Sequence, residues 1–369
     1  MLSPSSKITF VFNHGRKSRL NNTSSFPKEH FYCYFNFLEE YKNTKIIEYS
    51  ESESSYKLIS RILRKIFNFP IYIGKLLNSQ NKKLIKESEI IIFSNQNTYY
   101  SSFFYFLLKK IKHIEIIVLF MGYKNVLEEN GDFNFLQKSF FKLMISKISK
   151  ILFISNYEKE LFIKEFPEFK SRTSFVNFGI DYEFWKSKTS LNDRKKILFL
   201  GNDKNRDYEC VVDIVNQLKH ENFLLISNGI KEEDLKFDNY KLINSDWKTS
   251  KISDLELKSL MEEVGLSIIP IYESTTQPSG QSVALQSFAM EIPVLITKFK
   301  GLWDQKNIKD MENIFIVENN SIENWENKID EVLKNNELRN KISYNARELV
   351  KNKLNLKNFY SELLGVINS

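Results

Sequence analysis

The sequence predicts an α/β protein of two domains, each a parallel sheet covered by helices in the doubly wound arrangement. First, short β-branched segments alternate with segments of helical apolar spacing along the chain, as in sheets with crossover helices. Second, this alternation occurs twice, on either side of a polar run at residues 186–194 that has no apolar period. Third, the length of 369 residues exceeds one ordinary core. Two such halves imply a cleft between them.

The first half contributes five expected strands and several helices, assigned from apolar runs and from apolar residues at three- and four-residue spacing. The strands are expected at residues 8–12, 45–49, 89–93, 114–120 and 151–154. The helices are expected at about 28–41, within 55–87, from about 101, and at about 133–148.

The second half repeats the alternation with shorter connections. Its strands are expected at residues 197–200, 223–226, 240–243, 268–271, 294–296 and 314–317. Its helices are expected at about 208–219, at about 253–264 and from about 281, and a terminal helix lies within 355–369.

Composition limits the partners and the compartment. Lys and Arg number 53 against 46 Asp and Glu, a formal charge of +7, but Lys, Asn, Ile and Phe are abundant together, so we do not expect nucleic acid as a partner. Cys33 and Cys210 lie far apart without metal spacing, which favours a reducing compartment. No apolar run approaches the roughly 18 residues that span a bilayer, and no signal peptide is recognisable. We expect a cytoplasmic protein, free or peripheral on the inner face of the membrane.

The most informative segment is IIPIYESTTQPSGQSVALQSFAMEIPVLIT, residues 268–297. A strand leads into a turn with Ser279 and Gly280, a helix starts near Gln281, and a second strand follows Pro293, which predicts a βαβ crossover. The N–H groups at the helix start, including that of Ser282, have no intrahelical acceptor and lie at the positive end of the helix dipole. Gly280 allows close approach of the backbone. The segment therefore predicts an anion site suited to phosphate.

This segment resembles the nucleotide-sugar site of GT-B glycosyltransferases, most closely glycosyltransferase family 4, which carry a similar Ser-Gly-Gln run and a helix that ends before Pro-Val. Two further segments match in order. ILFISNYEKELFIKEFP and FVNFGIDYEFW, within residues 151–185, resemble the end of the first domain, and KKILFLGNDKNRDYE, residues 195–209, resembles the start of the second. The resemblance implies two Rossmann-like GT-B domains facing each other across a cleft: an acceptor domain at 1–187, a nucleotide-sugar domain at 195–354, and a helix at 355–369 that returns to the first domain.

The same resemblance implies the activity. We expect transfer of a sugar from a nucleoside diphosphate sugar to a hydroxyl of a glycan or lipid-linked glycan, in the biosynthesis of a bacterial surface polysaccharide such as lipopolysaccharide. The expected reaction retains the anomeric configuration, and the leaving phosphate takes the acceptor proton. Neither a metal nor another cofactor is expected.

Arg206 is the first candidate catalytic residue. It follows the strand at 197–200 in the loop GNDKNRD, and strand ends in α/β sheets face the ligand crevice. A guanidinium suits the charge that accumulates on a departing diphosphate, and by resemblance this loop holds a basic residue on the donor phosphates. Gly201 and Asn202 belong to the same predicted donor-binding loop. The alternative is an ordinary solvated arginine.

The acidic residues of the family pattern are replaced here. Gln286 stands where the family has a glutamate on the ribose hydroxyls, and an amide can accept the same bonds without charge assistance. Gln277 stands near the position of a second glutamate, and Glu273 is the nearest carboxylate. Both glutamines are predicted donor-binding residues and Glu273 a predicted catalytic one.

Two further candidates are aromatic or imidazole groups in loops. Trp247, after the strand at 240–243, is predicted to border the nucleobase, with simple packing as the alternative. His14 follows the first strand in FNHGRKS, where it could contact a phosphate or act as a base. The family's usual histidine is absent from Phe120, Met121 and Gly122, so His14 is a predicted catalytic substitute.

Residues 57–77 carry an amphipathic basic pattern. Six apolar residues fall on one helical face beside four basic ones: Leu58, Ile59, Ile62, Leu63, Ile66 and Phe67, with Lys57, Arg61, Arg64 and Lys65. Such helices lie in membrane interfaces, and contact with a membrane would imply a lipid-linked acceptor. A core-facing helix with a solvated basic side has the same pattern.

Absent motifs exclude other chemistry. The sequence has no G-x-G-x-x-G, no P-loop motif, no Cys/His cluster and no D-x-D pair, so it offers no dinucleotide, P-loop, zinc or metal-diphosphate site. Two alternatives stay open: a sugar-nucleotide epimerase on the same scaffold, and a non-catalytic nucleotide- or glycan-binding protein.

Overall fold

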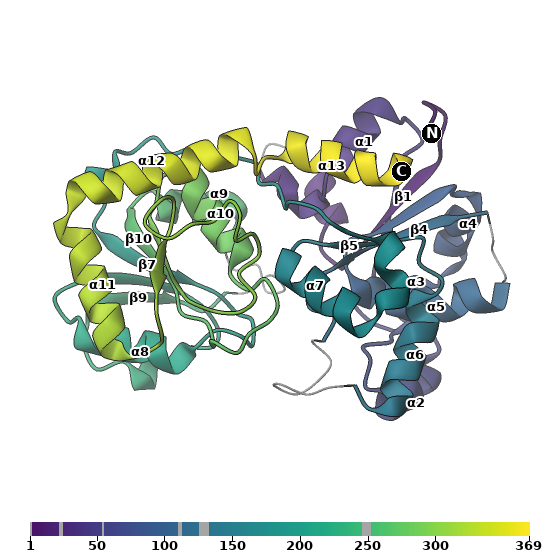
Figure 1. The fold of residues 1–369 in the computed structure, drawn as a ribbon, viewed down its shortest axis with the longest axis horizontal. Coiled ribbons are helices and arrows are strands. Elements are labelled where there is room, and N and C mark those ends of the chain that lie inside the picture. The colour runs from purple at the N-terminus through teal and green to yellow at the C-terminus, as the bar shows by residue number, and fades with distance from the viewer. Residues whose placement is uncertain (1, 22–24, 54, 110–112, 125–132, 246–251) are drawn as a thin grey trace. The chain divides into compact units, whose positions relative to one another are not determined.

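The computed structural model describes residues 2–21, 25–53, 55–109, 113–124, 133–245 and 252–369. They form two compact units (Figure 1). The first takes in the chain up to Asn177, apart from a short stretch before Lys28, together with Phe359–Ser369. The second consists mainly of Phe178–Asn358.

The first unit is built on a six-stranded parallel sheet in the order β2-β1-β3-β4-β5-β6. Its strands are short and mostly buried, as expected of a sheet covered on both faces. They are β1 (Ile8–Phe12), β2 (Lys45–Glu48), β3 (Ile90–Phe93), β4 (Glu115–Phe120), β5 (Lys150–Phe153) and β6 (Thr173–Phe175).

Helices connect these strands. They are α1 (Tyr34–Glu40), α2 (Lys57–Phe67), α3 (Ile73–Leu76), α4 (Ser79–Glu87), α5 (Gln96–Lys109), α6 (Phe135–Ile145) and α7 (Asn156–Glu165), with α13 (Leu356–Asn368) at the end of the chain. The core beside the sheet is aromatic, and Phe141 in α6 packs against Phe69, Phe133 and Phe166. Short 3-10 turns occur at η1 (Lys17–Asn21), η2 (Lys28–Phe31) and η3 (Pro167–Arg172).

The second unit has a parallel sheet in the order β12-β11-β10-β7-β8-β9. The strands are β7 (Lys196–Leu200), β8 (Asn222–Ile226), β9 (Tyr240–Ile243), β10 (Val264–Ile269), β11 (Val294–Thr297) and β12 (Phe315–Val317). The helices are α8 (Tyr208–Gln217), α9 (Asp254–Met261), α10 (Gln281–Ala289), α11 (Ile322–Lys334) and α12 (Asn336–Asn352), with turns η4 (Leu191–Asp193) and η5 (Glu232–Asp234). Helix α10 packs with α12 and α8 with α11, on opposite sides of this sheet (Figure 1).

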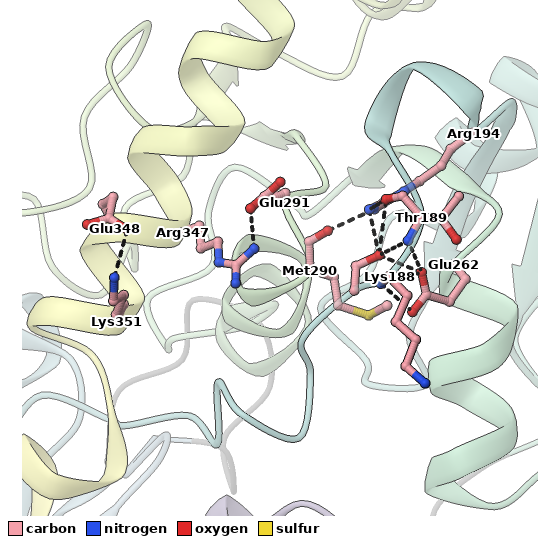
Figure 2. A network of polar contacts seen from close by, with 10 residues as sticks. Lys188, Thr189, Arg194, Glu262, Met290, Glu291, Arg347, Glu348 and Lys351 are labelled. Atoms are coloured by element: carbon pink, nitrogen blue, oxygen red, sulfur yellow. Dashed lines mark hydrogen bonds and ion pairs between the residues drawn. The ribbon is translucent and has the colours of Figure 1, made fainter.

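The first boundary lies at 177–178 rather than in the predicted interval 187–195, because the polar run is bound to the second unit. Arg194 is buried and donates through Nη1 to Met290 O at 2.8 Å and through Nη2 to Ser187 Oγ at 2.7 Å. Glu262 accepts from the backbone N–H groups of Lys188 and Thr189 (Figure 2). Side-chain and backbone groups of the polar run thus bind it to the second unit, although its composition predicted a linker.

The second boundary lies at 358–359, so most of α13 belongs to the first unit. Glu362 accepts from Asn177 N at 2.7 Å and from Asn177 Nδ2 at 2.9 Å. Tyr360 meets Phe37 of α1 edge to face, with ring centroids 4.9 Å apart. The apolar residues Phe359, Leu363 and Ile367 of α13 are buried.

Several predicted elements differ in their limits. The strand expected at 268–271 is β10, which ends at Ile269 because Pro270 has no N–H to continue a ladder. The helix expected at about 28–41 is broken into η2 and α1 by Cys33, whose φ of 67° is left-handed. The region 55–87 contains three helices, and α5 starts at Gln96, ahead of the predicted start. Helices α11 and α12 were not predicted individually.

Candidate functional site

Two loops of the second unit meet at the carboxyl edge of its sheet. One follows β7 and contains Arg206, and the other follows β10 and leads into α10. Because β7 and β10 are neighbours in the sheet, their carboxyl ends lie side by side, as at ligand sites of α/β proteins.

Gly280 is the residue before α10, and its φ of 78° lies in the left-handed region that favours glycine. A side chain has no room there either, since a Cβ would lie 2.8 Å from Ile269 Cγ2 and 3.1 Å from Arg206 Nη1. The first intrahelical bond runs from Ala284 N to Gly280 O at 2.9 Å. The N–H groups before Ala284, those of the predicted phosphate site, precede that bond and carry the positive end of the helix dipole.

Arg206 is buried, with 3% of its surface exposed, so it is not an ordinary solvated arginine. Its Nε donates to Asp203 Oδ2 at 2.8 Å. Gly201 also leaves room for it, because a Cβ there would lie 2.7 Å from Arg206 Nε. Nη1 is buried and donates to no atom of the described residues. A buried guanidinium N–H without an acceptor is costly, and this one lies at the start of α10.

Direct bonds join the two loops. Asp207 N donates to Pro270 O at 3.1 Å, and Tyr272 N donates to Asn205 O at 3.0 Å. Asn205 Nδ2 donates to Ser279 Oγ at 2.7 Å. The position of Arg206 relative to Gly280 is therefore determined by backbone as well as by side-chain bonds.

Residues 181–349 match the family model of glycosyl transferases group 1. The second unit belongs to this family. No curated protein matches the chain in sequence. The match covers both loops described above and the helix α10 between β10 and β11.

Solved structures extend the likeness to both units. Alr3699/HepE from Anabaena, in complex with UDP and glucose, matches with a TM-score of 0.67 at 11% identity, covering 99% of this chain and 100% of that one. Sucrose-phosphate synthase from Thermosynechococcus elongatus matches with 0.68 at 12%, covering 98% of each. WaaG, a glycosyltransferase involved in lipopolysaccharide biosynthesis, matches with 0.63 at 12%, covering 98% and 100%. The predicted GT-B fold is thereby confirmed, and the family matched by the second unit is one of glycosyltransferases. The finer assignment to family 4 stays a prediction.

Asn202 holds neighbouring loops together. Its Oδ1 accepts from Asn228 N at 2.6 Å, and its Nδ2 donates to Ser245 O at 2.9 Å. Ser227 Oγ donates to Gly201 O at 2.7 Å. Both polar atoms of the Asn202 side chain, which was predicted to bind the donor, are therefore hydrogen-bonded to the loops after β8 and β9. Trp247 lies outside the described residues.

The other predicted donor residues lie on or just before α10. Ser279 and Gln281 are buried, and Ser282 is exposed in the first turn. Gln286 is buried further along the helix, and Gln277 is half-buried in the preceding turn, where its carbonyl accepts from Ser279 N at 2.8 Å. These residues remain predictions as ligand contacts.

Glu273 is exposed, and its Oε1 accepts from Asn320 N at 3.3 Å. The structure therefore brings this carboxylate to the loop after β12. Sequence reasoning had placed it only by its nearness to Gln277 and had not identified Asn320.

His14 belongs to the first unit and Arg206 to the second. The His14 side chain is 57% exposed, and its Nδ1 lies 3.4 Å from Glu48 Oε1. Glu48 also accepts from Gly15 N at 2.7 Å and from Lys17 N at 2.5 Å. Glu48 thus holds the loop after β1, a role that sequence analysis missed because a carboxylate at a strand end carries no motif.

A second missed residue is Glu158 in the first turn of α7. It is buried, and its Oε1 accepts from Tyr123 N, in the loop after β4, at 2.5 Å. Its Oε2 has no hydrogen-bond partner in the described part of the chain. Burial raises the pKa of Glu158 to about 7, against the opposing bonds from the Tyr123 and Gly122 backbone. This carboxyl therefore titrates near neutral pH.

Helix α2 presents apolar side chains to solvent. Leu63 and Phe67 pack against the core and Ser60 is buried. The exposed apolar residues are Leu58 (64%), Ile59 (50%), Ile62 (48%) and Ile66 (56%). The apolar residues predicted to share one face are thus divided, because at 100° per residue they spread over about half of the helix circumference.

The later part of the predicted segment 57–77 is core. Ile71, Ile73, Leu76 and Leu77 are all buried. Arg64 is half-buried, donates to Ile71 O at 2.8 Å and lies 4.2 Å from the centre of the Tyr72 ring. Of the four basic residues, Lys57, Arg61 and Lys65 are exposed, and no ion pair joins them to another of the residues described.

Among the residues that the structure describes, no helix is long and apolar enough to cross a membrane. No group of three or more His, Cys, Asp or Glu side chains among them could hold a metal ion.

Proposed function

We propose that this protein is a glycosyltransferase that moves a sugar from a nucleoside diphosphate sugar to a hydroxyl of a glycan or lipid-linked glycan, with retention of configuration. The proposed setting is the assembly of a bacterial surface polysaccharide on the cytoplasmic face of the membrane. The observation that carries the proposal is the buried Arg206, whose Nη1 lies at the start of α10 within the region matched by the family. The UDP bound in the similar HepE structures supports the donor class.

In the proposed reaction, the bond between the anomeric carbon and the diphosphate oxygen breaks and a bond to the acceptor oxygen forms. The departing diphosphate keeps the electron pair and takes the acceptor proton through a phosphate oxygen. Arg206 Nη1 and the first N–H groups of α10 stabilise the negative charge that develops on it. Gln286 accepts from the ribose hydroxyls, and Gln277, Ser279, Gln281 and Ser282 line the donor. His14 and Glu273 are the proposed side-chain groups near the acceptor and the sugar.

The proposal is tested by screening nucleotide sugars for thermal stabilisation, because a ligand of the folded state raises the unfolding temperature by mass action. A stabilising donor is then incubated with glycan acceptors and the products are analysed. Formation of a new glycoside supports the transferase. Conversion of the nucleotide sugar to its epimer would identify the alternative epimerase, and binding without any product would identify a non-catalytic protein.

Removal of divalent metal is expected to leave transfer unchanged. The proposed charge stabilisation comes from Arg206 and the α10 terminus, which take the place of a cation. The measurement is turnover after dialysis against EDTA, with and without added Mg²⁺ or Mn²⁺. Loss of activity with rescue by either ion would contradict this part of the proposal.

We further propose that the first unit contacts an anionic membrane through the outward face of α2, beside a lipid-linked acceptor. Lys57, Arg61 and Lys65 recur at four-residue intervals and form one exposed stripe. Leu58, Ile62 and Ile66 form the adjacent exposed stripe. A core-facing helix accounts for Leu63 and Phe67 but not for this second stripe. Apolar insertion beside a row of cations is the arrangement of helices that lie in the interface of anionic bilayers.

Replacing Lys57, Arg61 and Lys65 together by serine is expected to weaken binding to anionic vesicles by roughly two orders of magnitude, since each contributes about 1 kcal/mol. Binding is measured by co-sedimentation with anionic and with neutral vesicles at low and physiological salt. Lys219, Lys236 and Lys241, exposed in the second unit, give a control triple variant with the same loss of charge. Equal sedimentation of the two triple variants, or none by the wild type, would refute the membrane contact.

A further inference from the structure

Asn320 lies in the loop after β12, directly before the Ser321 N-cap of α11. All four hydrogen-bonding positions of its side-chain amide are used. Nδ2 donates to Asp207 Oδ2 at 2.8 Å and to Ile271 O at 2.9 Å. Oδ1 accepts from Thr297 Oγ1 at 2.7 Å and from Trp325 Nε1 at 3.2 Å.

These partners determine the orientation of the amide. The indole N–H of Trp325 can only donate and the carbonyl of Ile271 can only accept, so oxygen and nitrogen cannot be exchanged. Thr297 Oγ1 completes the arrangement by accepting from Ile271 N at 2.9 Å. Thr297, Trp325 and Ile271 are all buried, where each of these bonds is costly to lose.

The two groups that accept from Nδ2 belong to the two loops of the donor site. Asp207 follows Arg206 directly, and its other carboxylate oxygen caps α8 by accepting from Cys210 N at 3.0 Å. Ile271 lies in the segment that leads to Gly280, and it forms an antiparallel bridge with Arg206. Asn320 thus bonds to the loop that carries Arg206 and to the loop that leads into α10. It lies in a third loop, after β12, which no sequence motif connects with the other two.

We propose that Asn320 is a positioning residue for Arg206. Its amide holds Asp207 against Ile271 and so sets where the guanidinium lies relative to the start of α10. The inference rests on the proposed function, because it assigns Asn320 a role only through the diphosphate contact of Arg206. Asn320 itself is bonded to protein groups and is not proposed to touch the donor.

The test is a double-mutant cycle read by binding. UDP, ADP and GDP are titrated into the full chain by calorimetry, and the tightest is used for all variants. Arg206→Ala is expected to weaken this nucleotide by at least about 10-fold, as for a lost charge-assisted bond. Asn320→Ala is expected to weaken it about 5- to 10-fold with Arg206 present, as for one misplaced bond. In the Arg206→Ala background the same change is expected to have no further effect.

Asn313→Ala is the matched control. Asn313 is also buried in the second unit, donating to Asn307 O at 2.8 Å and accepting from Lys309 N at 3.0 Å. Its replacement is expected to lower the unfolding temperature and to leave nucleotide affinity as in the wild type. If Asn320→Ala does not fold, Thr297→Val removes one donor to Oδ1 with little change of volume and is expected to act in the same direction.

Three outcomes are distinguished. Loss of affinity that depends on Arg206 supports the positioning role. Equal loss with and without Arg206, or no loss in Asn320→Ala and Thr297→Val, refutes it while the proposed function stands. Unchanged affinity in Arg206→Ala, or no binding of any of the three nucleotides by the wild type, refutes the proposed function itself.

Discussion

Arg206→Ala is expected to lower turnover by about 10² to 10³, equivalent to roughly 3 to 4 kcal/mol of transition-state stabilisation. The side chain is buried between two glycines, and its Nη1 lies at the start of α10, where the diphosphate charge is proposed to develop. The loss should fall mainly on kcat, because the charge is greater in the transition state than in the bound donor. Steady-state transfer with the donor found by thermal screening measures it.

Arg339→Ala provides the matched control for that measurement. Arg339 is a second buried arginine of the same unit, located on α12 and bonded to Asn192 at 3.3 Å. We expect this variant to lose stability and to keep the turnover of the folded protein. Near-wild-type turnover in Arg206→Ala would remove Arg206 from the mechanism, and equal losses in both variants would indicate a general effect of unfolding.

The second large effect concerns Glu158 and pH. Its pKa in the folded protein, about 7, is raised above its ordinary value of 4.5, so the folded state holds the proton more firmly than the unfolded state. The stability that this group contributes is therefore fully present below about pH 4.5, falls as pH rises toward about 7, and levels off above that pH, where the buried group ionises in the folded state as well. A difference of about 2.5 pKa units corresponds to roughly 3 kcal/mol at most.

Glu158→Gln should remove this pH dependence. The amide oxygen can still accept from Tyr123 N, and the amide cannot ionise. We expect the variant to match the wild type near pH 5 and to exceed it in unfolding temperature at pH 8. Thermal unfolding at several pH values measures the difference, with Glu160→Gln, an exposed carboxylate of the same helix, as the control. Parallel pH curves for Glu158→Gln and the wild type would show that burial of this carboxyl does not control stability.

Local sequence patterns were sufficient for the strands and for the crossover around α10. Period and composition report which face of a segment is buried and where glycine or proline interrupts it. The sequence of the segment 268–297 therefore predicted helix α10, the glycine at its N-terminus and a phosphate site at that position. The same patterns could not separate the two exposed stripes of α2 from the side that packs through Leu63 and Phe67, because all lie within one amphipathic repeat.

The sequence by itself determined two parallel α/β units, the loop that carries Arg206 and the glycosyltransferase resemblance, since these depend on residues close together in the chain. Only the tertiary structure decided that Arg206 is buried against Gly280, that Asn320 bonds Asp207 from 113 residues away, and that Glu158 is enclosed beneath the loop after β4. The physical reason is strand order. Placing β7 beside β10, β10 beside β11 and β11 beside β12 brings together loops distant in sequence, and no local period encodes which strand lies beside which.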